Sequence, residues 1–157
     1  MGVDYKVTLF SALHPLRLNR PLQEAMQRNL QTLGPVSFGA DDQAFGRTLQ
    51  RAAGIAETGY DGRLQPLASE PVYDGGSTDV AEVSWIAPTV GLKATTAPAG
   101  IPWHSWVATA AHGAAPATHG TLYAAKAIAF MAFDLLEDAN LRARAKQAFI
   151  RSRATAE

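Results

Sequence analysis

The chain has 157 residues, enough for one domain with a substantial core, and its 47% hydrophobic share is ordinary for a globular protein. Its 14 basic residues balance its 14 acidic ones, so no net field would recruit nucleic acid or an anionic membrane. Cysteine is absent, which excludes disulfides, thiolate catalysis and cysteine-bound zinc, and leaves histidines and carboxylates as the possible metal ligands.

The N-terminus and the apolar segments predict a cytoplasmic protein. Residues 1–6 lack the basic start and the apolar stretch of a signal peptide. The longest apolar run, residues 124–136, contains Lys126 and Asp134 and is too short and too polar to span a bilayer.

The first part of the chain predicts one strand and two helices. Residues 3–12 alternate apolar and polar side chains, which is the pattern of a half-buried strand. A helix is expected from Pro21 to about Leu33, with Asn19 as its N-cap. A second helix is expected from Asp41 to near Gly54. A single strand followed by two helices has no sequential partner with which to pair.

The middle of the chain predicts little regular structure. Residues 54–76 are rich in glycine and mixed polar residues, which favours a long loop. Val80 to Trp85 fits a short helix or a turn. Strands are expected at residues 89–96 and 103–110, so that the whole chain mixes helices with strands in an α/β or α+β fold.

The last part of the chain predicts two helices. Thr118 is expected to cap a long helix that runs to about Glu137, and Asn140 a final helix from Leu141 to about Ser152. The periodicity of the long helix predicts an inward face made by Leu122, Ala125, Ile128, Ala129, Ala132 and Leu136.

His104 is the first candidate metal ligand. It follows Pro102 and lies between Trp103 and Trp106, so a partly apolar pocket would favour the neutral imidazole that binds metals. The alternative is a packed histidine that is hydrogen-bonded to the backbone, because one histidine never defines a metal site.

The segment from Gly75 to Asp79 is a candidate ligand-binding loop. Its two glycines allow close approach of a ligand, and Ser77, Thr78 and Asp79 can cap a following helix. Free N–H groups at such a helix start attract anions, for example a carboxylate. Asp79 is also suited to orient a metal ligand. The alternative is a simple helix cap after a loop.

The other histidines favour structural roles. His112 and His119 lack the i, i+4 spacing that places two ligands on one helical face, so surface or capping roles are expected. His14 precedes a proline at the end of the predicted strand and is expected to be structural.

Three motifs resemble those of a known enzyme family. Gly75–Trp85, Gly100–Trp106 and Thr121–Ala127 follow one another in this order, with Leu18–Leu22 and Leu33–Pro35 before them. Together they resemble the C-terminal part of aminobenzoyl-glutamate hydrolase-like amidohydrolases. These belong to the zinc peptidase superfamily that includes hippurate hydrolase and carboxypeptidase G.

The resemblance implies a fold and a division of the chain. The fold would be α/β, the C-terminal portion of a zinc-peptidase-like catalytic domain with a mixed sheet and flanking helices. Residues 1–17 would be the remnant of a lid or dimerisation domain and hold one leftover strand. Residues 18–157 would be the C-terminal segment of the catalytic domain.

The resemblance also implies roles for particular residues. His104 matches a metal ligand, and Gly76, Ser77, Thr78 and Asp79 match the loop that binds the substrate. His119 matches a histidine adjacent to the site, whose role stays open. The complete family site holds zinc or manganese, and a glutamate activates the metal-bound water. No early His-x-Asp segment and no Glu-Glu pair occurs in this sequence, so no catalytic residue is assigned.

The expected parent reaction is hydrolysis of an amide bond between an N-acyl or aminobenzoyl group and an amino acid, by a truncated chain that is inactive alone. A non-catalytic binding or assembly protein and one half of a split amidohydrolase are the alternatives. The expected partners are a small amide substrate and either a second copy or a missing N-terminal half, without nucleic acid or membrane. Truncation further predicts an exposed apolar surface or strand edge, and therefore self-association.

Overall fold

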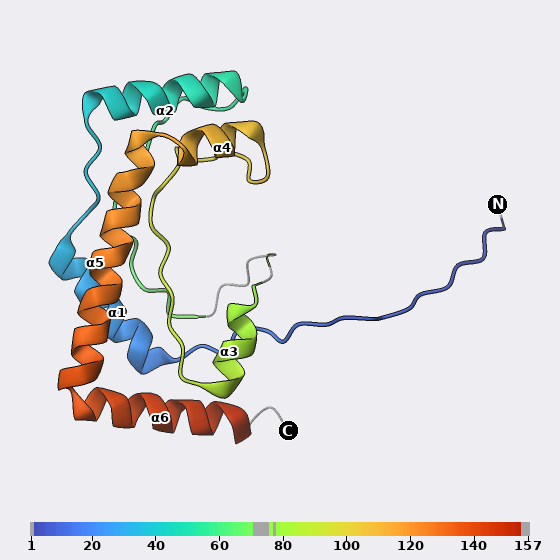
Figure 1. Ribbon diagram of the computed structural model, residues 1–157, viewed down its shortest axis with the longest axis vertical. Helices are drawn as coiled ribbons and strands as arrows, with labels where there is room; N and C mark the ends of the chain where they lie inside the picture. Colours follow the sequence, from blue (N-terminus) through green and yellow to red (C-terminus); the bar gives the residue numbers. More distant parts are fainter. Residues whose placement is uncertain (1, 71–75, 77, 155–157) are drawn as a thin grey trace.

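The structure is a computed structural model that describes residues 2–70, 76 and 78–154 (Figure 1). The described residues form six helices and no strand. Helices α1 and α5 lie between α2 and α4 at one end and α6 at the other. Extended segments connect α1 to α2 and α3 to α4, whereas only one or two residues separate α4, α5 and α6. The helices are α1 (Arg20–Leu33), α2 (Ala40–Ala52), α3 (Val80–Ile86), α4 (Trp106–His112), α5 (Ala115–Glu137) and α6 (Ala139–Ala154).

The expected α/β fold with a mixed sheet is wrong for this chain. Residues 3–12 and 89–96, which were expected to be strands, are extended, but no ladder of backbone hydrogen bonds joins either one to another described segment. A strand persists as part of a sheet only when its N–H and C=O groups pair with a neighbour. The alternating pattern therefore predicts the extended backbone of these segments but not their pairing.

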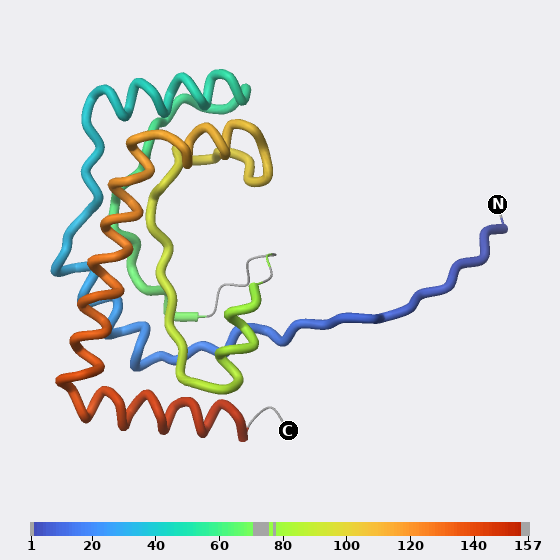
Figure 2. Tube along the Cα trace, viewed as in Figure 1, coloured from blue at the N-terminus to red at the C-terminus, as the bar shows by residue number. Residues whose placement is uncertain are grey.

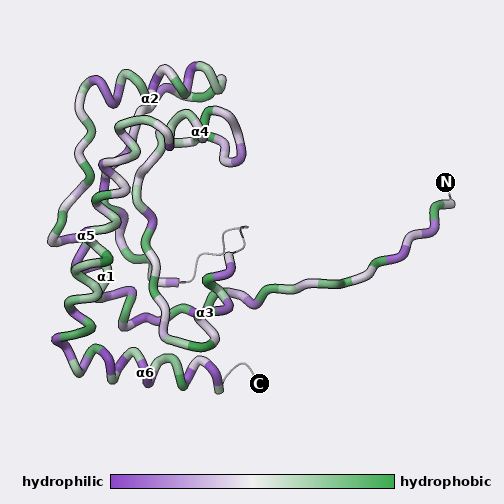
Figure 3. The backbone as a smooth tube through the Cα atoms, in the orientation of Figure 1, coloured by the Kyte–Doolittle hydropathy of each residue, from purple (hydrophilic) through white to green (hydrophobic). Residues whose placement is uncertain are grey.

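Residues 2–13 form an exposed arm that leads away from the helices (Figure 2). Hydrophobic and hydrophilic residues alternate along it (Figure 3). Five of its six large apolar side chains are between 80% and 94% exposed, namely Val3, Tyr5, Val7, Leu9 and Phe10, and the sixth, Leu13, is 47% exposed. The arm therefore has the apolar face of a half-buried strand without any described residue to cover that face.

The helices expected near the N-terminus are confirmed. Asn19 caps α1, since its side-chain oxygen accepts a hydrogen bond from the N–H of Leu22 at 3.4 Å. Gly34 follows the helix with φ of 74°, and its N–H donates to the carbonyl of Leu30. Helix α2 begins one residue before the predicted Asp41 and ends at Ala52.

The strand expected at residues 103–110 is wrong, because α4 occupies most of it. Ser105 is the N-cap, and its hydroxyl oxygen accepts a hydrogen bond from the N–H of Ala108 at 3.3 Å. Val107, Ala108 and Ala111 are buried, which is a helical and not an alternating spacing. Alanine favours helix more than any other residue, and the capping serine fixes where the helix begins.

Helix α5 begins at Ala115, so Thr118 is not its N-cap, and Pro116 lies in its first turn. The predicted inward face is also wrong. All six of its residues are exposed, and α5 instead buries Pro116, Ala117, Gly120, Ala127 and Met131. The helix is apolar on nearly every side, so hydrophobic periodicity could not choose the face that packs.

Two clusters make up the core. The larger one joins α1, α5 and α6 through Leu22, Met26, Met131 and Leu141, among others. The smaller one joins α2 to α4 and contains Leu49, Ile101 and Val107. Among the described residues, none of the helices has the length and apolar character needed to cross a bilayer.

Candidate functional site

His104 lies in the turn that leads into α4, with its side chain exposed. Its backbone φ is 61°, which makes it the single non-glycine residue with positive φ in the described part of the chain. This left-handed conformation costs a non-glycine residue about 1–2 kcal/mol. No described residue hydrogen-bonds to the imidazole ring, so the ring nitrogens are free to bind a ligand.

The tryptophans beside His104 do not form the apolar pocket that the sequence predicts around it. Trp103 and Trp106 are 69% and 65% exposed. The ring of Trp103 lies instead against His112, with a centroid separation of 5.2 Å. The neighbouring tryptophans therefore do not bury the imidazole of His104, which is exposed.

The predicted substrate loop leads into α3. The Thr78 hydroxyl oxygen accepts a hydrogen bond from the N–H of Val80 at 3.3 Å, and the Thr78 carbonyl accepts one from Ala81 at 3.0 Å. Asp79 is the N-cap residue, but its carboxylate makes no capping hydrogen bond. Gly76 is exposed, as are Thr78 and Asp79, while Ser77 lies outside the described residues.

The other histidines contact neighbouring segments. His112 joins α4 to the extended segment before it, because Nε2 lies 3.1 Å from the Thr96 hydroxyl and Nδ1 lies 2.7 Å from the Ala108 carbonyl oxygen. His119 Nε2 lies 3.4 Å from a carboxylate oxygen of Asp42. None of these interactions involves His104.

The donor set of the described residues does not fit a complete metal site. No group of three or more histidine, aspartate and glutamate side chains that could hold a metal ion occurs among residues 2–70, 76 and 78–154. Zinc and manganese need several such ligands for useful affinity. His104 can therefore supply one ligand to a metal, and no catalytic step follows from this chain alone.

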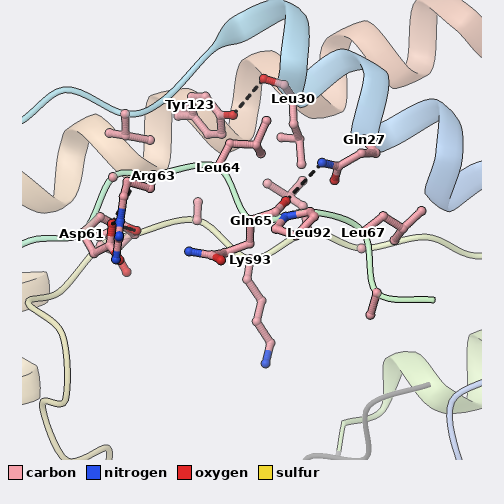
Figure 4. Close-up of a pocket in the computed structure, with 18 of the residues that line it drawn as sticks. Gln27, Leu30, Asp61, Arg63, Leu64, Gln65, Leu67, Leu92, Lys93 and Tyr123 are labelled. Carbon is pink, nitrogen blue, oxygen red and sulfur yellow. Dashed lines mark hydrogen bonds and ion pairs between the residues drawn. The ribbon is translucent and has the colours of Figure 1, made fainter. Parts of the chain in front are cut away.

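A groove of about 920 Å³ lies along the inner side of α1 (Figure 4). Two extended segments, residues 61–70 and 91–101, form much of its wall. Its apolar lining includes Leu30, Leu64 and Leu92. Among the described residues, neither His104 nor Gly76, Thr78 or Asp79 of the predicted loop lines the groove.

Hydrogen bonds between α1 and its neighbours fix one side of the groove. The Tyr123 hydroxyl donates to the Leu30 carbonyl at 3.3 Å, and the Gln27 amide donates to the Gln65 carbonyl at 3.1 Å (Figure 4). Partial burial raises the pKa of Tyr123, so its hydroxyl stays protonated and keeps donating at neutral pH. No motif in the sequence predicts this groove, because residues 54–70 have the composition of a loop.

An ion pair lies within the wall of the groove. Arg63 contacts Asp61 through its guanidinium, with Nη2 2.7 Å from Oδ2, and through its backbone N–H. These hydrogen bonds lower the pKa of Asp61 to about 2, the guanidinium contact being the largest cause. Asp61 is therefore ionised at neutral pH and offers no proton for general acid catalysis.

Comparison with protein-family models, with curated proteins and with solved structures gave no match to this chain. The likeness to the amidohydrolases therefore rests on the motifs in the sequence.

Proposed function

We propose that the chain is the C-terminal part of a metal-dependent amidohydrolase. The parent reaction is hydrolysis of the amide bond between an acyl or aminobenzoyl group and an amino acid. The observation that carries the proposal is His104, whose imidazole is exposed, makes no hydrogen bond to any described residue and is held by a left-handed backbone. Residues in costly backbone conformations concentrate at functional sites.

In this proposal His104 is one metal ligand, and the other ligands come from a polypeptide segment outside the sequence. That segment would also supply the glutamate that activates water. The metal would be zinc or manganese, and the reaction would take place in the cytoplasm. The Gly76–Asp79 loop would bind the small amide substrate through its hydroxyls and backbone N–H groups, with His119 adjacent to the site.

The isolated chain has too few metal ligands to be a catalyst. One imidazole holds zinc or manganese too weakly for catalysis, because catalytic sites use three protein ligands or more. The isolated chain should therefore be inactive, and activity should appear when the missing ligands are provided.

The test is reconstitution. The chain is co-expressed with the N-terminal part of an aminobenzoyl-glutamate hydrolase that carries the His-x-Asp segment and the Glu-Glu pair. With zinc or manganese added, the complex should hydrolyse aminobenzoyl-glutamate. His104→Ala should lower kcat/KM by on the order of 100-fold or more through loss of a ligand. The control, Gln31→Ala, changes an exposed residue of α1 and should leave kcat/KM unchanged.

Two results would count against the proposal. If the isolated chain binds stoichiometric zinc and cleaves the amide, the missing-ligand argument is wrong. If His104→Ala and Gln31→Ala give equal activity in the complex, His104 is not a ligand. Activity that needs a separate natural partner chain would identify one half of a split amidohydrolase.

A second candidate function is non-catalytic binding or assembly. The observation that favours it is the amount of apolar side chain that the described helices leave exposed. The arm of residues 2–13 and the outer side of α5 both carry large hydrophobic residues without cover. Such surfaces are typical of protein interaction sites.

A further inference from the structure

Helix α5 is apolar on the side that faces away from the core. We define its outer face by seven exposed residues at helical spacing: Leu122, Ala125, Ile128, Ala129, Ala132, Phe133 and Leu136. The four large ones are each more than half exposed, from 55% for Leu122 to 77% for Leu136. The opposite side of the helix already packs against α1 and α6 through Ala127 and Met131. A helix that is apolar all round is normally buried all round.

We propose that the outer face of α5 pairs with the same face of a second copy, with the two helices antiparallel. Leu122, Ala129 and Leu136 recur every seven residues, and Ala125 and Ala132 lie between them. This spacing forms a narrow apolar seam of the kind that joins two helices. Since one chain provides both halves of such an interface, the contact closes by two-fold symmetry.

The distribution of side-chain sizes suits this pairing. Small alanines occupy the middle of the seam and leucines its ends. An antiparallel arrangement that sets Ala129 against Ala132 of the second copy also sets Leu136 against Ala125. Leu136 of each copy then meets the small Ala125 of the other, whereas Leu122 lies beyond the end of the partner α5. The backbones can therefore approach closely between residues 125 and 136.

The charge of Lys126 favours this register of the antiparallel pair over one that is shifted by a heptad. It borders the outer face and is the charged residue nearest to the middle of the seam. With Ala129 against Ala132, its ammonium lies beside the ring of Phe133 of the second copy, which favours a cation–π contact. A shift of one heptad would set Ala129 against Ala125 and bring the two Lys126 side chains together, which like-charge repulsion disfavours.

The outer face is small for a stable dimer interface. Four large apolar residues and three alanines from each copy place the buried area near or below the lower end of the about 1,200–2,000 Å² range of specific interfaces. The dimer should therefore be reversible and dependent on concentration. This inference does not depend on the proposed amide chemistry, because no residue of the candidate metal site takes part.

Sedimentation equilibrium of the full chain tests the proposal. Between about 1 and 200 µM, where an interface of this size dissociates, the mass should rise from 16.7 kDa toward twice that value. Ala129→Glu places a charge at the centre of the seam and should raise the dimer Kd at least about tenfold. The matched control is Ala143→Glu, at an exposed alanine of α6, which should leave Kd unchanged.

Disulfide trapping tests the register, since the chain has no cysteine of its own. Ala129→Cys with Ala132→Cys should give a covalent dimer under mild oxidation. Ala125→Cys with Ala129→Cys, which suits the shifted register, should crosslink far less. A chain that stays monomeric throughout the range overturns the proposal. So does a dimer that tolerates Ala129→Glu but disappears when residues 2–13 are deleted, because the arm would then form the interface.

Discussion

The carboxylate of Glu82 holds His14 at the base of the exposed arm. The backbone N–H of His14 donates to Oε1 at 2.8 Å, and the ring Nδ1 lies 2.9 Å from Oε2. Next to this pair, the Trp85 indole N–H donates to the Pro15 carbonyl, and the Arg17 guanidinium lies 3.5 Å from the centre of the Trp85 ring. These contacts with α3 fix the point from which the arm leaves the molecule.

Loss of the Glu82 charge should weaken the contact between His14 and Glu82. The hydrogen bonds from His14, first from its backbone N–H and then from its ring, lower the pKa of Glu82 below its ordinary value of 4.5. The contact therefore contributes stability above that pH and loses it as the pH falls through the lower folded-state pKa. Hydrogen exchange at the amides of residues 14–17 should accelerate on acidification through this window, relative to α1.

The variant Glu82→Gln should give the same fast exchange already at pH 7. The control is Glu137→Gln at the exposed end of α5, which should change nothing at residues 14–17. Equal exchange in the wild-type protein and in Glu82→Gln would mean that the carboxylate does not hold the arm.

Gln50 is a buried hydrogen-bonding centre between α2 and two loops. Its side chain is fully buried, its amide donates to the Ala99 carbonyl at 2.7 Å, and its oxygen accepts from the Gly59 N–H at 2.7 Å. Gln50→Leu should destabilise the fold by about 1–3 kcal/mol, because it leaves the buried Gly59 N–H and the part-buried Ala99 carbonyl without partners. Urea unfolding measures this, with Gln31→Leu at an exposed position of α1 as the control. If Gln50→Leu lowers the free energy of unfolding by less than Gln31→Leu does, water has replaced the amide as the partner of these backbone groups.

Local signals in the sequence predict helices well. The capping Asn19 and the glycine at position 34 mark the ends of α1, because the relevant hydrogen bonds join residues only three or four positions apart. The short helix or turn expected at Val80–Trp85 corresponds to α3. The loop expected at 54–76 has no helix or strand over residues 55–70, and the Gly75 and Ser77 positions lie outside the described residues.

Non-local relationships were not predictable in the same way. The pattern at residues 3–12 is that of a strand, but pairing needs a second segment at the right place, which no local pattern encodes. For α5, apolar residues on both sides left two possible inward faces, and contact with α1 and α6 selected the one with Ala127 and Met131. The exposure of His104 likewise depends on how its turn folds and not on the residues beside it.

Gly120 allows α5 to lie directly against the extended segment before α4. A Cβ at this position would collide with the backbone carbonyl of Thr95, which cannot move as a side chain can. In an isolated helix Gly→Ala stabilises by about 1 kcal/mol. Here Gly120→Ala should instead destabilise by about 1–3 kcal/mol, the usual cost of overpacking. Thr118→Ala, at an exposed position two residues earlier, is the control and should be neutral or slightly stabilising.

The measurement for Gly120→Ala is thermal or urea unfolding of the two variants beside the wild-type chain. Because Thr95 also donates to the Asp61 carbonyl, a shift of this segment should disturb the wall of the groove as well. A Gly120→Ala protein as stable as Thr118→Ala would mean that the helix and the segment are not in this close contact.

The strain at His104 can be measured without reference to any ligand. His104→Gly and His104→Ala both remove the imidazole, but only glycine adopts φ of 61° without steric cost. The glycine variant should therefore be more stable than the alanine variant by about 1 kcal/mol in urea unfolding. At Ser37, an exposed loop residue without positive φ, the order should reverse by about 0.4–1 kcal/mol in favour of alanine, since alanine restricts the unfolded chain.

The stability of His104→Gly relative to the wild-type chain tests whether the histidine is retained for function. If His104→Gly is also more stable than the wild-type chain, the imidazole is kept at a cost to folding, as expected of a residue retained for a site. The same variant should lose activity in the reconstituted amidohydrolase, so stability and function would change in opposite directions. Equal stability of the glycine and alanine variants would mean that the turn is unstrained, and the backbone argument for a functional His104 would fail.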